Sequence, residues 1–367
     1  MRMSADRHVC RVSTVRDHGA VGDGVTDDTK AVQAAIDAGG VTVFPPGTYS
    51  CGTLTMRRAS HLVGTNSGTY TYSVAAGYLD DYRPGEVSRL VRRPGTNGPL
   101  IDGPLGAKRV VIEDLQLDGN DEGQPGCAAP VVDIADAPTS EDTQWVISRC
   151  FVRGGRGPGP GDHGGGGSNV YIGAGRMACH VTHTVSNYAT THGFEVNGAD
   201  TVVESCIVGD NGGAGVTIGA WVTTITTCAL FNNTHGIYVA DTGDGSPKRI
   251  LICANGIDRN RQNGILVDRG TTSGAAGVSI MNNAFTTNST DGDDTWAHVN
   301  IRATTGHVAL GGNVFSVVED GYAASTTAAV FLGPGASALD MGNIYEGGSV
   351  GGFTNRPTAL YSGTRMG

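Results

Sequence analysis

The sequence has few charged residues, few aromatic residues and no long apolar run. Charged residues make up 16% and aromatic residues 6% of the 367 positions. No apolar stretch approaches the roughly 20 residues that a transmembrane helix needs, so we expect no membrane span. The formal net charge of −10 repels the phosphates of nucleic acids and anionic lipids, so neither is an expected partner.

The N-terminal sequence, MRMSADRHVCRVSTVRDHG, lacks the apolar core and the cleavage site of a secretory signal. We therefore expect a cytoplasmic protein if Met1 is the native start, and a secreted one if a signal peptide precedes it. The eight cysteines show no C-x-x-C spacing, which argues against a zinc site. With only three lysines in the chain, a lysine base is poorly supported. The sequence leaves the oligomeric state open.

The chain is instead rich in glycine, with 58 residues, and in small β-forming residues. This composition is typical of many short strands joined by tight turns, rather than of helical layers. One segment, residues 17–49 (DHGAVGDGVTDDTKAVQAAIDAGGVTVFPPGTY), predicts a helix followed by a strand. Thr26 or Asp27 is expected to cap the helix, which ends at Gly39 or Gly40.

Residues 17–49 resemble the opening of the pectate-lyase-like superfamily, which includes polygalacturonase-type hydrolases, polysaccharide lyases, epimerases and phage tailspikes. The resemblance implies a right-handed parallel β-helix whose first coil is capped by this helix. It covers about a tenth of the chain and does not specify the reaction. We interpret Asp23, Asp27 and Asp28 as turn and cap residues, because their spacing fits those roles.

The rest of the chain repeats with the period of a solenoid, and two columns of residues recur about every 22 to 30 positions. In the first column an apolar residue follows two places after a Cys or Asn. Its members are Cys150, Cys179, Cys206, Cys228, Asn255, Asn283, Asn313 and Asn343. We expect this column to form a buried ladder at one corner of the coils, with reduced cysteines, because stacked side chains point the same way.

The second column is a short strand in which two apolar residues flank a central residue. These strands are expected at residues 132–134, 170–172, 194–196, 216–218, 237–239, 265–267, 299–301 and 330–332. Side chains alternate across a strand, so the apolar residues face inward and the central residue faces outward.

The expected fold is therefore all-β: a single-stranded right-handed parallel β-helix of about eight or more coils with a short N-terminal capping α-helix. We expect one domain over residues 1–367, with the cap helix and first strand at 17–49 and clear coils over 100–350. Loop insertions are expected at 66–86, 154–167 and 241–249.

The outward residues of the second column form a strip along one sheet. They are Asp133, Tyr171, Glu195, Thr217, Tyr238, Leu266, Asn300 and Phe331. Neighbouring coils lie about 4.8 Å apart, so Tyr171, Glu195, Thr217 and Tyr238 are expected to be contiguous.

We predict the catalytic residues in this strip and just before it. His192 or His235 is a candidate general base, Tyr171 or Tyr238 a candidate acid, and Glu195 a candidate base or orienting residue.

Candidate substrate-binding residues flank the strip. They are Thr217 within it, Arg259, Arg261 and Arg269 as partners of a substrate carboxylate, and Tyr72 and Tyr78 in the loop 66–86.

No cofactor is expected from the sequence. Calcium is possible, but no ligand set can be identified: Asp291, Asp293 and Asp294 are interpreted as a solvated turn. His180 and His183 lie near His192 in sequence, yet a metal site would need His163 from a loop, so we predict no metal site.

Three functions remain open. The first is a carbohydrate-active lyase that acts by β-elimination on a uronic-acid-containing glycan, with His and Tyr as acid and base and Arg binding the carboxylate. The second is an intracellular cyclase or isomerase of polyketide-type metabolism. The third is a non-catalytic or tailspike-like glycan-binding module. Hydrolysis is disfavoured because the paired carboxylate motifs of polygalacturonases are missing. The expected ligand is thus a glycan or a small molecule.

Overall fold

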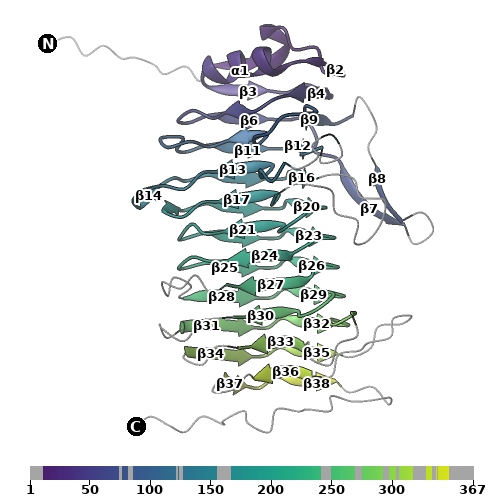
Figure 1. Cartoon of the computed structure of the whole chain (residues 1–367), viewed down its shortest axis with the longest axis vertical. Helices are drawn as coiled ribbons and strands as arrows, with labels where there is room; N and C mark the ends of the chain where they lie inside the picture. The colour runs from purple at the N-terminus through teal and green to yellow at the C-terminus, as the bar shows by residue number, and fades with distance from the viewer. Residues whose placement is uncertain are drawn as a thin grey trace, which may run out of the picture.

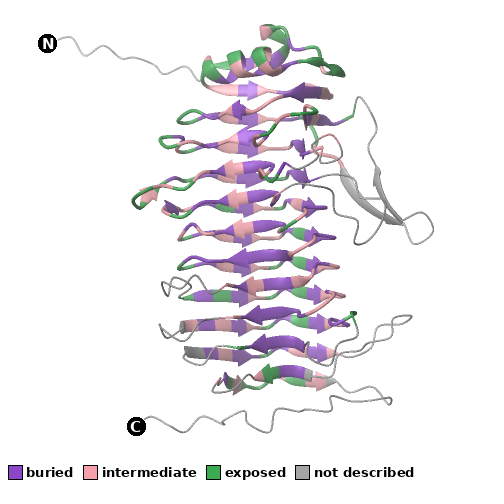
Figure 2. Cartoon of the chain, viewed as in Figure 1, coloured by how far each residue is buried: buried purple, intermediate pink, exposed green. Residues whose placement is uncertain are grey.

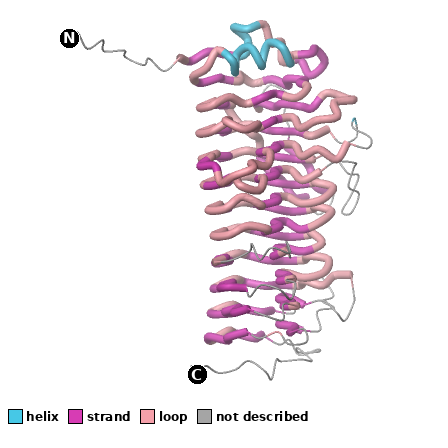
Figure 3. Tube along the Cα trace, turned by 60° about the vertical axis from the view of Figure 1, so that its left-hand side comes forward, coloured by secondary structure: helices cyan, strands magenta, loops and turns pink. Residues whose placement is uncertain are grey.

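The computed structural model describes residues 11–73, 77–81, 86–120, 123, 127–154, 167–240, 249–268, 275–291, 297–302, 306–316, 328–332, 336 and 338–346. Figure 1 shows a column of stacked coils with the helix α1 at the N-terminal end. Three long parallel sheets, named here sheets A, B and C, run along the column. Figure 3 shows how each coil passes through the strands and the connecting turns.

Sheets A and B each contain twelve strands. Sheet A consists of β1 (Val12–Thr14), β3 (Val41–Val43), β6 (His61–Val63), β11 (Val111–Glu113), β15 (Val146–Ser148), β19 (His180–Thr182), β22 (Val202–Glu204), β25 (Thr224–Thr226), β28 (Ile250–Cys253), β31 (Ala275–Met281), β34 (Gly306–Gly311) and β37 (Ala338–Met341). Sheet B consists of β2 (Asp23–Asp27), β4 (Gly47–Cys51), β9 (Ser88–Arg92), β12 (Gln116–Asp118), β16 (Phe151–Arg153), β20 (Val185–Asn187), β23 (Ile207–Gly209), β26 (Ala229–Phe231), β29 (Gly256–Asp258), β32 (Ala284–Thr286), β35 (Val314–Ser316) and β38 (Ile344–Glu346).

Sheet C contains ten strands and carries the strip of outward residues. It consists of β5 (Leu54–Thr55), β10 (Ile101–Asp102), β13 (Val132–Ile134), β17 (Val170–Ile172), β21 (Phe194–Val196), β24 (Ala214–Ile218), β27 (His235–Val239), β30 (Ile265–Val267), β33 (Ala297–Ile301) and β36 (Ala328–Leu332). Two short pairs lie outside these sheets: the antiparallel pair β7 (Thr69–Ser73) and β8 (Gly77–Asp81), and the parallel pair β14 (Glu141–Asp142) and β18 (Arg176–Met177). The predicted fold class, a right-handed parallel β-helix, is confirmed.

The helix α1 (Thr29–Asp37) closes the first coil, after a short 3₁₀ helix at Val15–His18. The expected cap at Thr26 or Asp27 was wrong by one or two residues, because Asp28 is the N-cap and its side chain does not cap the helix. The carboxylate of Asp28 instead accepts the backbone N–H groups of Val21 and Gly22, at 2.7 and 3.0 Å. Because Asp28 is buried and accepts these two N–H groups, its role is to hold the lead-in turn, not to react with a substrate.

The core runs through the centre of the column, as the buried strand segments in Figure 2 show. The inward positions of sheet C are fully or almost fully buried, for example Val170, Phe194 and Val216 at 0% exposure. Each coil alone leaves one edge of this apolar surface open, and the next coil covers it. Stacking is thus what stabilises the individual short strands.

The corner between sheets A and B carries the predicted Cys/Asn ladder. Side chains in each coil accept the backbone N–H of the coil before it: Cys228 N–H donates to Asn255 Oδ1 at 2.9 Å, and Asn255 N–H to Asn283 Oδ1 at 3.0 Å. One member was assigned wrongly: Thr184, not Cys179, occupies the corner after β19 and accepts Cys150 N–H at 3.4 Å. The insertion 154–167 lengthens that coil, so the expected spacing missed the correct residue.

A second ladder, which the sequence analysis did not identify, lies between sheets B and C. Asn211, Asn233, Asn260 and Asn288 each accept the backbone N–H of the preceding coil at 2.9 to 3.2 Å. All four are fully buried. Their recurrence, one asparagine per coil, is visible in the sequence and would have predicted this ladder. These amides satisfy backbone groups that would otherwise be buried without partners.

The cysteines within the described residues are unpaired. Cys51, Cys127, Cys150, Cys179, Cys206 and Cys228 are buried, and Cys253 is half-buried. Burial raises the pKa of the Cys150 thiol to about 12. These thiols pack as small apolar side chains.

Candidate active site

The outward strip of sheet C exists with the predicted register. Strand pairing aligns Asp133 with Tyr171, Tyr171 with Glu195, and Glu195 with Thr217. The column continues through Tyr238, Leu266, Asn300 and Phe331. It extends toward the N-terminus through Asp102. Side chains that are distant in sequence are therefore placed side by side by the stacking of coils.

Asp133, Tyr171 and Glu195 line a pocket of about 340 Å³. The remaining lining residues, Ala128, Pro130, Gly167, Ser168 and Thr191, come from the turns that lead into sheet C. The three sheet residues are half-buried, so their polar atoms are partly shielded yet reachable. This pocket is the densest group of acid–base side chains on the strip.

Glu195 is held in a fixed orientation by two side chains. Ser168 Oγ donates to one carboxylate oxygen at 2.7 Å, and Asn197 Nδ2 reaches the other at 3.5 Å. Ser168 Oγ also lies 3.0 Å from Thr191 Oγ1. Because these contacts fix the position of the carboxyl group, Glu195 is placed to exchange a proton at one defined position.

Asp133 has the opposite electrostatic setting. Its Oδ1 atom is buried without a hydrogen-bond partner. Burial, followed by the negative charges of Asp102, Asp136 and Glu195, raises the pKa of Asp133 to about 6. One pocket thus combines a carboxyl group that stays protonated in mildly acidic solution with a carboxylate that is stabilised by donors.

Tyr171 lies between these two carboxyl groups. Its hydroxyl group donates to Asp136 Oδ1 at 2.8 Å, and that oxygen also accepts Ala174 N–H at 2.7 Å. Burial and the hydrogen bond to Asp136 raise the pKa of Tyr171 to about 12. The phenol therefore stays protonated and can act as a proton donor.

His192 and His235 lie in the coil positions that the sequence predicted, with Ala214 between them. Both rings accept a backbone N–H of the next coil through Nδ1: Ala214 N–H at 3.0 Å for His192, and Asn263 N–H at 3.3 Å for His235. Burial lowers the pKa of both, to about 4 for His235. Nδ1 of each histidine therefore accepts a backbone N–H from the next coil. Neither histidine lines the pocket.

Within the described residues, the other histidines and arginines considered as candidates are not brought to the pocket. His180 and His183 lie on and just after β19 in sheet A, a different sheet from the strip. Arg259 forms an ion pair with Asp258 at the end of β29. Arg261 donates to the carbonyl groups of Asn211 and Gly212, at 3.3 and 2.8 Å, so it holds neighbouring coils together.

Three outward side chains in the C-terminal part of the strip are almost inaccessible to solvent. Thr217 is 7% exposed, Leu266 4% and Asn300 1%, although all three lie on the outward column. Tyr238 is half-buried, and its ring centroid lies 6.0 Å from that of His235. Phe331, at the C-terminal end of the strip, is 41% exposed but carries no acid–base group. The accessible acid–base groups on neighbouring coils are therefore Asp133, Tyr171 and Glu195.

Several predicted residues lie outside the described part of the structure. Arg269 and His163 are among them, as are most of the insertions 154–167 and 241–249. The backbones of Tyr72 and Tyr78 belong to β7 and β8, but their side chains are not described. The roles of these residues stay predictions.

No group of three or more His, Cys, Asp or Glu within the described residues is arranged to hold a metal ion. Calcium use therefore stays an open expectation. No helix in the described part of the chain is long and apolar enough to cross a bilayer.

The sequence analysis missed four residues of the site: Asp133 as a catalytic candidate, Ser168, Asp136 and Asn197. Asp133 was visible in the outward column, and its position next to Tyr171 was a usable signal. Ser168, Asp136 and Asn197 lie in turns, where the period-2 pattern gives no orientation.

The fold and site together define a β-helix with an acid–base pocket on its outer sheet surface. A family model described as "Rhamnogalacturonase A/epimerase, pectate lyase-like" matches residues 12–83, and one described as "Right handed beta helix region" matches residues 139–315. The chain belongs to the pectate-lyase-like superfamily of right-handed parallel β-helix proteins.

Two curated relatives from Azotobacter vinelandii match about a third of the chain. Mannuronan C5-epimerase AlgE2 is 35% identical over 125 residues, which is 30% of this chain and 11% of the relative. Alginate lyase 7 is 32% identical over 125 residues, 30% of this chain and 13% of the relative. The matched part thus spans about a tenth of the length of these relatives.

Solved structures share the fold over nearly the whole chain. Tailspike protein 2 of an Escherichia coli O157:H7 bacteriophage has a TM-score of 0.68 at 16% identity, covering 93% of this chain and 43% of the tailspike. The A-module of the Azotobacter vinelandii mannuronan C-5 epimerase AlgE4 has a TM-score of 0.65 at 17% identity, covering 91% and 95%. At such identities the likeness concerns the fold alone.

Proposed function

We propose that the protein is a polysaccharide-modifying enzyme that removes a proton from a uronic-acid residue bound in the Asp133–Tyr171–Glu195 pocket. The observation that carries the proposal is the placement of three different acid–base groups around this one pocket. The names of the sequence relatives, epimerases and an alginate lyase, support a uronate glycan as substrate. They give no support to the cyclase alternative.

Each pocket residue has a role in such a reaction. Glu195, oriented by Ser168 and Asn197, takes the proton on the ring carbon next to the carboxylate. Protonated Asp133 donates a hydrogen bond to that carboxylate and so stabilises the negative charge that develops on it. This assignment replaces the arginines in the role of carboxylate partner.

The group that Tyr171 protonates distinguishes two reactions, β-elimination and epimerisation. In β-elimination, the electron pair of the broken C–H bond forms a C=C bond, the bond to the leaving oxygen breaks, and Tyr171 protonates that oxygen. In epimerisation, a proton returns to the same carbon from the opposite face and the glycosidic bond stays intact. The raised pKa of Tyr171, about 12, keeps its proton available for either donation.

The test is to incubate the protein with polymannuronate and a panel of other polyuronates, with and without calcium. Rising absorbance near 235 nm reports the unsaturated product of elimination, and deuterium uptake at the ring carbon in D₂O reports proton exchange. Glu195→Gln is expected to lower the rate by about 100-fold or more, the usual contribution of a positioned base. Activity is expected to decline as pH rises through about 6, where Asp133 loses its proton.

Asp142→Asn is the matched control, since Asp142 is an exposed carboxylate on β14 away from the pocket. It should retain wild-type activity. Full activity of Glu195→Gln would contradict the proposal.

A second candidate is hydrolysis of a glycosidic bond. One observation favours it: Asp133 and Glu195 are two carboxyl groups two coils apart on the same sheet surface, and glycosidases use such a pair as acid and base. New reducing ends without absorbance near 235 nm would select hydrolysis. Glycan binding without turnover of any polymer would select the tailspike-like binding function instead.

A further inference from the structure

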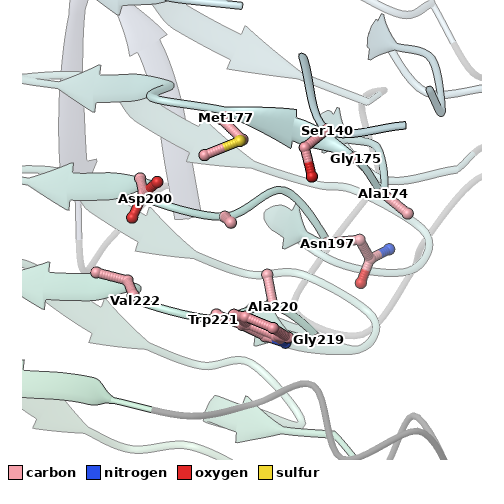
Figure 4. A pocket seen from close by; sticks show the side chains of 11 residues that line it. Ser140, Ala174, Gly175, Met177, Asn197, Asp200, Gly219, Ala220, Trp221 and Val222 are labelled. Atoms are coloured by element: carbon pink, nitrogen blue, oxygen red, sulfur yellow. The ribbon is translucent and has the colours of Figure 1, made fainter. Parts of the chain in front are cut away.

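A second pocket, of about 430 Å³, lies beside the first where the strands of sheet C end. Its walls come from four successive coils, in the turns after β13, β17, β21 and β24. Ser140 follows β13 and Met177 follows β17. Asn197 and Asp200 follow β21, and Trp221 and Val222 follow β24; Figure 4 shows these side chains around the pocket. The remaining lining residues are Ala174, Gly175, Ala199, Gly219 and Ala220.

The walls of this pocket are amphipathic. Trp221 is 51% exposed and Val222 38% exposed, so an indole and an aliphatic group face solvent side by side. Opposite them, the Asn197 amide, the Asp200 carboxylate and the Ser140 hydroxyl supply polar groups. A pyranose ring has the same division, with an apolar face of C–H groups and an edge of hydroxyl groups. A pocket of this volume is within the range of small-molecule sites.

The two pockets share a connecting residue. Asn197 lines the second pocket and places its Nδ2 atom 3.5 Å from Glu195 Oε1 in the first. Ala174, which lines the second pocket, also contacts the first site. Its N–H donates to the Asp136 oxygen that also accepts the Tyr171 hydroxyl group. A chain of sugars that leaves the first pocket along this flank therefore enters the second.

We propose that the Trp221 pocket is a separate sugar-binding subsite for the same glycan, an inference that rests on the proposed function. One pyranose ring places its C–H face on Trp221 and directs hydroxyl groups toward Asp200 and Asn197. The carboxylate of a uronate residue points away from Asp200, because two like charges in contact repel each other. The subsite adds affinity for long chains without taking part in the proton transfer.

The subsite predicts that Trp221 contributes to binding in proportion to chain length. The probes are sized oligomannuronates and sized neutral manno-oligosaccharides, titrated against wild-type protein and Trp221 variants by calorimetry and by tryptophan fluorescence. Trp221→Ala is expected to weaken binding of the long oligosaccharides about tenfold or more, as loss of a central Trp contact does. Binding of the shortest ones should change little. Trp221→Phe should restore part of the loss, because it keeps an aromatic face.

Leu251→Ala is the matched control, since Leu251 is another exposed apolar residue, on sheet A. Equal affinity of wild-type and Trp221→Ala protein for every chain length would overturn the subsite, and so would the absence of binding to all probes. Chain-length-dependent binding that requires Trp221 supports the subsite even if no polymer is turned over, in which case only the proposed reaction fails. Where turnover is present, the variant should raise KM for long chains and leave kcat unchanged.

Discussion

Asp133 is the carboxyl group of the pocket whose pKa is raised by its surroundings, to about 6. Its carboxyl group meets no hydrogen-bond donor at Oδ1 and faces three other acidic side chains. Both effects disfavour its charged form, while Glu195 nearby has donors on both oxygens. The two carboxyl groups therefore differ in their immediate contacts, although both line the same pocket.

This setting predicts a pH dependence of folding stability. The pKa of Asp133 is about 6 in the folded protein and near 3.8 in the unfolded chain, so the folded state binds more protons between these values. The contribution of Asp133 to stability is thus fully present below pH 3.8 and is lost as pH rises to about 6. Asp133→Asn should remove this decline, as urea unfolding measured between pH 4 and 7 will show.

Asp142→Asn again provides the comparison, because an exposed carboxylate should leave the profile unchanged. A profile of Asp133→Asn that retains the wild-type slope would show that Asp133 titrates normally.

The asparagine ladders act at the scale of the coil. Asn233 Oδ1 accepts the backbone N–H of Asn211 at 3.1 Å, and its Nδ2 donates to the Val208 carbonyl at 3.1 Å and to Asn260 Oδ1 at 3.2 Å. Each amide therefore joins three successive coils in a place that water does not reach. Stacking order is maintained by these polar bonds as well as by the apolar core.

An asparagine in the interior of a ladder should contribute more to the free energy of unfolding than one at the end of a ladder. Asn233→Ala leaves a buried N–H and a buried carbonyl unpaired, and is expected to lower the free energy of unfolding by about 3 kcal/mol. Asn343→Ala should cost less, because Asn343 is half-buried and is the last member of the other ladder in the described part of the chain. Chemical denaturation of both variants measures the difference. Equal losses would argue against the ladder as the source of coil stability.

At the scale of the whole molecule, the column buries its thiols together with its core. Cys150 and Cys179 are about 1% exposed, and burial raises their pKa to about 12 and 11. They present almost no thiolate to solvent while the stack is closed. Their reactivity therefore reports how the column opens.

Native protein treated with iodoacetamide at pH 8 should be labelled readily at Cys253, which is half-buried, and very slowly at Cys150 and Cys179. Adding urea through the unfolding transition should expose all three, and peptide mass spectrometry identifies the labelled sites. If Cys150 reacts as fast as Cys253 in native buffer, the centre of the column opens without global unfolding.

Much of this architecture was predictable because it depends on local patterns. The alternation of apolar and polar residues around Glu195 specifies which side chains face outward, and the recurrence of Asn255, Asn283 and Asn313 specifies a corner. Prediction failed at Thr184, where an insertion changes the length of one coil and hides the equivalence with Cys150. It failed again at Ser168, because a turn residue has no periodicity that gives its direction.

Local residue patterns were enough to predict the parallel β-helix, its capping helix and the outward strip from Asp133 to Phe331, since such a repeat depends on residues close together in the chain. The folded structure was needed to show that Asp133, Tyr171 and Glu195 share a pocket. It was equally needed to show that His192, His235 and Arg261 form hydrogen bonds between coils. The physical reason is that burial, hydrogen-bond partners and pKa depend on contacts between coils, and those contacts are fixed by turn lengths and conformations that no repeat specifies.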